Sequence, residues 1–155
     1  MLLRCKTDVN ASAETVFACV DEPEHIVKWV GGAVSHTYVT ERNPANPVGQ
    51  RFLQKLRVGN SVNEFNGEII AWEAPTHFGL HIPTAAYSSE AHFRITPKGP
   101  AQSTVDYSID VTLHTLTARV LGTLLRIPLG FFVRNQIGQL KAYAEKVQAS
   151  RLKGG

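Results

Sequence analysis

The sequence contains few cysteines, little net charge and no secretory leader, and each absence narrows the choice of function. Cys5 lies in an alternating apolar and polar pattern and Cys19 in a helical one, so each is expected to be a small buried residue rather than half of a disulfide. The formal net charge is only +3, and the basic residues are scattered, which argues against nucleic acid as a partner. The first residues lack the apolar core and cleavage site of a signal peptide, so a cytoplasmic location is expected.

Motifs for catalysis and metal binding are also missing. The sequence has no nucleophile elbow, no phosphate-binding glycine loop and no cysteine ligand cluster. His77 and His81 have the spacing of metal ligands on a helix, but on a strand they would lie about 13 Å apart and could not share an ion. Like His92, Asp106 and Asp110, they alternate to the expected solvent side. We therefore expect no metal and no cofactor, and we assign no catalytic residue.

What is present is an ordinary globular composition with one strong helical pattern near the end. The 155 residues, 43 % hydrophobic, favour a single domain over 1–155 that buries roughly 70 % of the surface of its unfolded chain. Within residues 131–147, apolar side chains recur at steps of three and four, the spacing of one face of an α-helix. The residues of this face are Val133, Ile137, Leu140, Ala144 and Val147. Such a face needs a surface to pack against.

The preceding chain supplies that surface as a series of strands. A first alternating segment over 3–9 is followed by two short helices, with Ser12 as an N-cap and Pro23 in the first turn of the second helix. Six more alternating segments, separated by Pro, Gly and Asn turns, lie at about 34–40, 50–58, 61–72, 78–82, 87–95 and 105–113. The pattern predicts an α+β fold in which a seven-stranded, curved antiparallel sheet wraps around a long C-terminal helix.

Three segments resemble a known family at corresponding positions. Residues 9–17 (VNASAETVF), 21–24 (DEPE) with Trp29, and 68–75 (EIIAWEAP) are similar to the START-related helix-grip superfamily, and most of all to its polyketide cyclase/dehydrase-like branch. The resemblance covers nearly the whole chain. It implies a deep apolar cavity between the sheet and the terminal helix. The superfamily includes lipid carriers, hormone receptors, aromatase/cyclases and quinone-binding chaperones, so the fold alone does not specify an activity.

Strand alternation independently predicts which residues line this cavity. Phe65, Ile69 and Ala71 share one face of their strand, and the other strands alternate likewise. A few polar residues occur on the same side, where they could either bond to protein atoms or orient a ligand. The predicted ligand-binding residues are Trp29, Phe52, Gln54, Asn63, Phe65, Phe78, Leu80, Tyr87, Ser89, Phe93, Tyr107, Ile109, Ile137 and Leu140.

The apolar stretch over residues 116–132 is the second unusual feature. Arg119 and Arg126 interrupt it and Pro128 lies inside it, so it is a poor transmembrane segment. Pro128 should break or kink a helix near Ile127, which predicts a short apolar helix before the main one. That helix could pack over the cavity rim, or serve as a lid, a homodimer surface or a transient membrane contact. At a membrane, Arg119, Arg126 and Arg134 would contact the phosphates.

Three functions remain open from the sequence. The first is binding or transport of a hydrophobic small molecule such as a lipid, a quinone or a polyketide-like aromatic. The second is a cyclase/dehydratase-type enzyme that uses Tyr87, Tyr107 and Asn63, although no inward-facing Arg or His is evident. The third is a protein-interaction module that uses residues 116–132. A cavity filled by side chains would favour the third, and an open cavity with an activated proton donor would favour the second. An open cavity without such a donor would favour the first.

Overall fold

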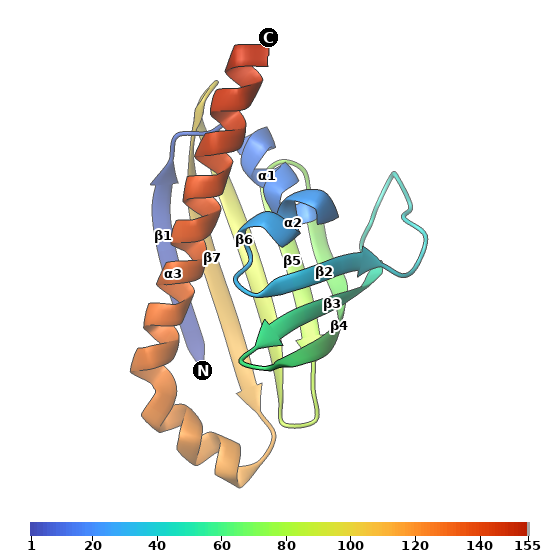
Figure 1. Ribbon diagram of the computed structural model, residues 1–155, viewed down its shortest axis with the longest axis vertical. Helices are drawn as coiled ribbons and strands as arrows, with labels where there is room; N and C mark the ends of the chain where they lie inside the picture. The colour runs from blue at the N-terminus through green and yellow to red at the C-terminus, as the bar shows by residue number, and fades with distance from the viewer. Residues whose placement is uncertain (155) are drawn as a thin grey trace.

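The computed structural model describes residues 1–154 and has the predicted α+β helix-grip architecture, in which one long helix crosses the concave face of a curved sheet (Figure 1). Two short helices follow the first strand, as expected. The elements are β1 (Leu2–Val9), α1 (Ala13–Asp21), α2 (Pro23–Trp29), β2 (Ala33–Tyr38), β3 (Arg51–Val58), β4 (Ser61–Glu73), β5 (His77–Pro83), β6 (Tyr87–Gly99), β7 (Gln102–Leu113) and α3 (Leu116–Gly154).

The sheet is antiparallel throughout, with strand order β1-β7-β6-β5-β4-β3-β2. Strands β2 to β7 follow one another as neighbours, and β1 pairs with β7, so the first and last strands of the chain lie side by side at one edge. Short helix α1 begins where Ser12 caps it, because the Ser12 hydroxyl accepts a hydrogen bond from the Thr15 amide at 3.1 Å. The seven predicted strands and the two short helices after the first strand are therefore confirmed.

One register shift in β4 changes which side chains face inward. The pairing of β4 with β5 is irregular between Ile69 and Ala71. Beyond the shift, Trp72 reaches the concave side, where its ring lies edge-on to Phe17 with centroids 5.4 Å apart. Ala71 instead lies beside Gly79 on the convex side. The prediction that Ala71 shares a face with Ile69 is wrong, because a bulge inserts a residue and reverses the alternation after it.

Helix α3 is longer than predicted and contains Pro128 within its span. The prediction of a separate short helix is wrong, since helical geometry continues from residue 116 to residue 154. Proline removes one backbone donor and distorts one turn, which a long helix with intact turns on both sides can tolerate as a bend. Figure 1 shows the N-terminal part of α3 running at an angle to the rest. We refer below to the N-terminal segment (residues 116–132) and the C-terminal segment (residues 133–154) of α3.

The C-terminal segment packs onto the sheet as its spacing predicts. Ile137, Leu140 and Ala144 belong to a buried core that includes residues of β1, α1 and β7, and the half-buried Val147 packs against it. Val133 is also buried. The two cysteines are free thiols, as expected, but only Cys19 is fully buried; Cys5 is half-buried at the edge of the core. Burial raises the pKa of the Cys19 thiol to about 12.

Polar contacts fix the C-terminal segment to the β1–α1 connection. The Lys141 ammonium donates to the Asp8 carbonyl at 2.6 Å, and the Asn10 amide donates to the Glu145 carboxylate at 2.9 Å. Further along, the Gln148 side-chain oxygen accepts from the Ser12 amide at 3.0 Å and from a threonine hydroxyl of α1 at 2.8 Å. These bonds hold the helix in one position along the sheet.

Candidate functional site

A cavity of about 610 Å³ lies between the concave face of the sheet, helix α2 and the N-terminal segment of α3. Every strand contributes to its wall, and most of the wall atoms are apolar. Side chains from β3 to β7 reach it because the sheet curves away from the helix at this end (Figure 1). A volume of this size is in the range of pockets that enclose small organic molecules.

The structure places most of the residues predicted to bind a ligand in the wall of this cavity, and two of them elsewhere. Leu140 is 1 % exposed and belongs to the packed core, because it lies about one helical turn beyond Ile137, where the space is already filled. Asn63 is exposed. It lies on the predicted face of β4, but this end of the β3–β4 hairpin extends past the helices that would cover it. The residues in the wall are Trp29, Phe52, Gln54, Phe65, Phe78, Leu80, Tyr87, Ser89, Phe93, Tyr107, Ile109 and Ile137.

Two parts of the wall contain residues that were not in the predicted ligand-binding set, although packing of residues 116–132 over the cavity rim was one of the alternatives that the sequence left open. The N-terminal segment of α3 contributes Leu121, Leu125, Leu129 and Phe132, whose spacing of four, four and three is a helical stripe that the sequence shows. Strand β2 contributes His36, which pairs across the ladder with Gln54 of β3. The expectation that no histidine faces inward is therefore wrong. The signal was the alternation within β2, which places His36 and Tyr38 on one face.

His36 is the most unusual group in this wall. Its ring stacks on Phe52 with centroids 4.8 Å apart and meets the edge of Tyr38 at 5.4 Å. Both ring nitrogens are shielded from solvent and have no hydrogen-bond partner among the described residues. Burial lowers the pKa of the imidazole to about 4, against a weaker opposing effect of Asp21, so the ring is neutral at pH 7. A neutral imidazole can donate one hydrogen bond and accept another.

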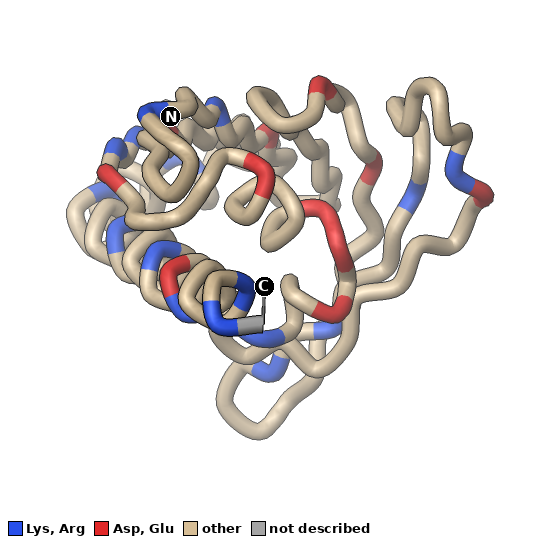
Figure 2. Tube along the Cα trace, turned by 90° about the horizontal axis from the view of Figure 1, so that it is seen from above, with Lys and Arg blue, Asp and Glu red and all other residues tan. Residues whose placement is uncertain are grey.

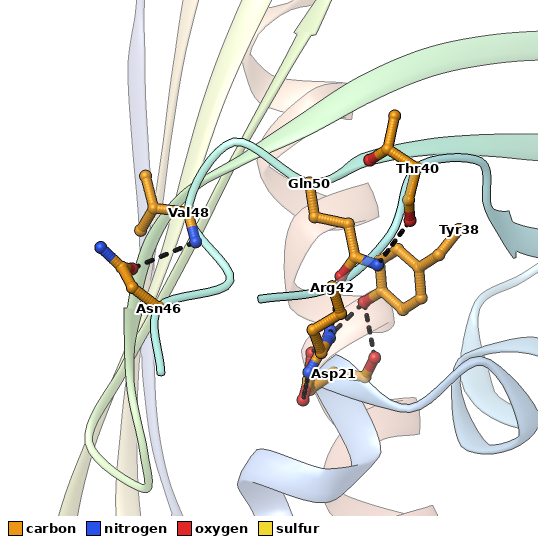
Figure 3. A network of polar contacts seen from close by, with 7 residues as sticks. All are labelled: Asp21, Tyr38, Thr40, Arg42, Asn46, Val48 and Gln50. Atoms are coloured by element: carbon orange, nitrogen blue, oxygen red, sulfur yellow. Dashed lines mark hydrogen bonds and ion pairs between the residues drawn. The ribbon is translucent and has the colours of Figure 1, made fainter. Parts of the chain in front are cut away.

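A polar network holds β2 and the following loop against α1 (Figure 3). The Tyr38 hydroxyl donates to the backbone carbonyl of Asp21 at 2.6 Å. Arg42 binds both carboxylate oxygens of Asp21, at 2.9 and 2.7 Å, and its Nε donates to Gln50 at 2.8 Å. Gln50 in turn donates to the Thr40 carbonyl at 3.1 Å. The network occupies the Tyr38 hydroxyl and pairs the Asp21 charge, so neither group is free to act on a ligand.

The remaining polar side chains of the wall are uncharged. The Tyr107 hydroxyl and the Gln54 amide make no hydrogen bond to any residue between 1 and 154, and burial raises the pKa of Tyr107, so it stays protonated. The Ser89 hydroxyl makes only a long contact, 3.5 Å, to the Ile82 carbonyl. Within the described chain, no Asp, Glu, Lys or Arg side chain lines the cavity. The site is therefore suited to a neutral, largely apolar molecule with a few oxygen atoms.

The other histidines of the central strands lie outside the cavity. His77 and His92 come together on the convex face, where His77 Nε2 and His92 Nδ1 are 2.8 Å apart. Gly79 lies beneath this pair, since a Cβ on Gly79 would come within 2.8 Å of His92. The convex position of Gly79 agrees with the alternation of β5, although the residue is buried rather than open to solvent. No group of three potential metal ligands occurs among the described residues.

Comparison with known proteins identifies similar folds. The family model described as polyketide cyclase / dehydrase and lipid transport matches residues 4–145. A START superfamily protein from Mycobacterium smegmatis is 17 % identical, with a TM-score of 0.77 over 94 % of this chain and 98 % of the other. A protein of Thermus thermophilus is 13 % identical, with a TM-score of 0.74 over 95 % and 99 %.

A third similar structure is that of a two-domain protein from a biosynthetic pathway. The di-domain ARO/CYC protein BexL, from the BE-7585A biosynthetic pathway, is 14 % identical, with a TM-score of 0.76 over 94 % of this chain and 46 % of BexL. At these identities the likeness concerns the fold. No curated protein matches the sequence.

Proposed function

Since the chain belongs to the polyketide cyclase / dehydrase and lipid transport family, we propose that it binds a hydrophobic small molecule in its cavity and acts as a carrier or sensor of that molecule. The observation that supports this proposal most is the cavity of about 610 Å³ with an apolar wall. An empty apolar cavity leaves its lining without contact partners, so a protein gains stability when a molecule of matching shape fills it.

The polar groups of the wall restrict the class of ligand. His36, Gln54 and Tyr107 provide uncharged donors and acceptors within an otherwise apolar enclosure. A charged ligand would lose its hydration there without a counter-ion, which is unfavourable. A lipid alcohol, a quinone or an aromatic polyketide-like compound would bury its carbon skeleton and place one or two oxygen atoms near these groups.

The neutral fluorescent probe N-phenyl-1-naphthylamine offers a direct test of binding. The wild-type protein should bind one probe per chain with saturation. Ile109→Trp places a large side chain in the cavity and should lower probe affinity at least tenfold. Ser108→Trp, on the opposite face of the same strand, is the matched control and should leave the affinity unchanged. Equal affinity in both variants would show that the probe binds outside the cavity and would contradict the proposal.

A cyclase-type enzyme is a second candidate, and His36 is the observation that favours it. A neutral imidazole in an apolar cavity can accept a proton from a carbon between two carbonyl groups, the step that begins an aldol cyclisation. Against this function, burial makes Tyr107 a weaker acid than usual and the low pKa makes His36 a weak base. The wall thus offers no activated proton donor. We therefore favour the carrier or sensor function over the enzyme function.

The two candidates differ in what a His36→Phe variant should do. A carrier would keep its affinity for a purely apolar probe in this variant. An enzyme would lose turnover of a synthetic poly-β-ketone, measured by chromatography of the cyclised product, while still binding the substrate. Absence of turnover by the wild-type protein, together with retained binding, would support the carrier function.

A further inference from the structure

The outward face of the N-terminal segment of α3 is an exposed apolar surface. Large apolar side chains there are 58 to 78 % exposed, far more than those of a packed helix. They recur at steps of four, four, three and four, so they lie in one row along the helix. The residues of this row, called here the outer row, are Leu116, Val120, Leu124, Ile127 and Phe131.

The opposite face of the same segment lines the ligand cavity. Leu121, Leu125 and Leu129 contribute to the cavity wall, and they lie on a different face of the helix from the outer row. The segment is therefore a single layer between the cavity and the surroundings. Gly122, Pro128 and Gly130 lie in this layer, and each is a residue that weakens helical structure. A molecule passing between the cavity and an apolar phase on the outside would have only this layer to cross.

In the sequence of the N-terminal segment, basic residues flank the outer row and no acidic residue occurs. Arg119, Arg126 and Arg134 follow one another at seven and eight residues, close to two helical turns, so they lie along one side of the helix. The sequence has no Asp or Glu from Val111 to Ala144. None of the three arginines forms an ion pair with a described residue. Figure 2 shows basic residues recurring along the helix that leads to the C-terminus.

We propose that the outer row docks on an anionic lipid bilayer, where Arg119, Arg126 and Arg134 contact the lipid phosphates. The N-terminal segment of α3 would then lie between the bilayer and the cavity. The inference rests on the proposed function, because a bilayer is where a hydrophobic ligand would be collected or delivered. The positive charge matches anionic lipid. A second copy fits less well, since pairing two outer rows would bring arginines together without acidic partners.

The segment is more consistent with an interfacial position than with a transmembrane one. By length and composition α3 could cross a membrane. The C-terminal segment of the same helix, however, is packed and hydrogen-bonded to the sheet. Arg119 and Arg126 would also lie within the hydrocarbon of a spanning helix.

Co-sedimentation with lipid vesicles tests the proposal. The full-length protein should bind vesicles of phosphatidylcholine with 30 % phosphatidylserine, and bind vesicles of phosphatidylcholine alone at least tenfold more weakly. The double variant Leu124→Ser, Ile127→Ser should lower binding to anionic vesicles about tenfold or more, because both side chains are exposed and would lose their contact with lipid. Arg126→Glu should lower it roughly thirtyfold and reduce its dependence on salt.

Matched controls lie on the far side of the sheet. Val39→Ser removes a side chain that is 56 % exposed, and Arg51→Glu reverses an exposed charge, both at the ends of the loop between β2 and β3. Neither should change vesicle binding. The outer-row variants should keep their affinity for N-phenyl-1-naphthylamine, so a failure of docking and a failure of ligand binding would be distinguishable.

Several results would overturn the proposal. One is vesicle binding that is equal for neutral and anionic lipid or that the outer-row variants leave unchanged. Another is a dimer in light scattering that the Leu124→Ser, Ile127→Ser variant abolishes, without any vesicle binding, since the occupant would then be a second copy. Protein that high salt and alkaline carbonate fail to extract from vesicles would indicate a spanning helix instead.

Discussion

The interior enclosed by the sheet and α3 has a packed end and a hollow end, and the same helix covers both. At the packed end, Leu140 and Ala144 are at most 1 % exposed and interlock with residues of α1 and β7. At the hollow end, Leu121 and Leu125 face a cavity of about 610 Å³ on one side, yet are 49 and 46 % exposed. Hydrogen bonds also connect the helix to β1 and α1 at the packed end.

The difference separates the source of stability from the site of function. Close packing and buried hydrogen bonds in one half of the interior stabilise the fold, so the other half can remain open without unfolding the protein. Substitutions at the packed end should therefore affect stability first, and substitutions at the hollow end should affect ligand binding first. The following experiments are ordered by the size of the expected effect.

Leu140→Ala should show the largest effect. It removes a fully buried side chain at the packed end and should lower the free energy of unfolding by about 2 to 5 kcal/mol. Leu125→Ala, a truncation of the same size in the cavity wall, should cost less than about 1 kcal/mol because its side chain is 46 % exposed and loses few packing contacts. Urea denaturation followed by circular dichroism measures both. Equal losses would remove the distinction between the two ends.

Acid should destabilise the hollow end through His36. The unfolded chain binds a proton at this imidazole below pH 6.5, whereas the folded protein binds it only below about pH 4. Between these values the unfolded state holds more protons, so stability falls as the pH falls, by about 3 kcal/mol from this group. The lowered pKa of His77 acts in the same direction. The difference between wild type and His36→Phe, measured by urea denaturation at pH 7, 5.5 and 4, isolates His36; a constant difference would contradict the burial of its neutral form.

Gln148→Ala tests the polar contacts of the packed end. Its side-chain oxygen accepts from the Ser12 amide and the Thr15 hydroxyl, and the residue is 7 % exposed. Truncation should lower the free energy of unfolding by about 1 to 2 kcal/mol, because a buried hydroxyl and a partly buried amide lose their acceptor. Gln139→Ala, at an exposed position of the same helix, is the control and should change stability by less than about 0.5 kcal/mol. Probe affinity should stay the same in both.

Tyr107→Phe should give the smallest effect, confined to binding. The hydroxyl belongs to the cavity wall and has no hydrogen-bond partner among residues 1–154, so its loss should weaken binding of 1-naphthol about fivefold and leave binding of naphthalene unchanged. Ser108→Ala, on the other face of β7, should alter neither affinity. Calorimetric titration with the two compounds measures the difference. A loss that is equal for both compounds would indicate a change of cavity shape rather than a missing hydrogen bond.

The sequence predicted the packed end better than the hollow end, for a physical reason. Close packing imposes a period, so the spacing of Ile137, Leu140 and Ala144 was sufficient to predict the buried face of α3. Alternation likewise assigned Phe52, Phe93 and Tyr107 to the concave side. The spacing of apolar residues shows which face of a helix or strand is buried, but not how far the neighbouring elements cover that face. For this reason Leu140 was expected in the cavity wall rather than in the core. For the same reason Asn63 was expected in the wall rather than in solvent.

Other features of the structure could be predicted from the sequence only weakly or not at all. The bulge between Ile69 and Ala71 depends on how two strands pair, and no residue type at that point reveals it. Pro128 indicated a disturbance of the helix, yet whether it separates two helices or bends one depends on the contacts of both flanks. The inward position of His36 could have been predicted, because β2 alternates like its neighbours. That neither ring nitrogen has a hydrogen-bond partner within residues 1–154 is evident only from the structure.

Native mass spectrometry of the protein isolated from its source cells, followed by denaturing extraction, tests the central claim most directly. We expect a fraction of the wild-type chains to carry one neutral, hydrophobic molecule with few oxygen atoms, and the Ile109→Trp variant to carry none. A wild-type protein that is free of any bound molecule, and that stays free when lipid, quinone and aromatic extracts are added, would contradict the claim that the cavity is a ligand-binding site.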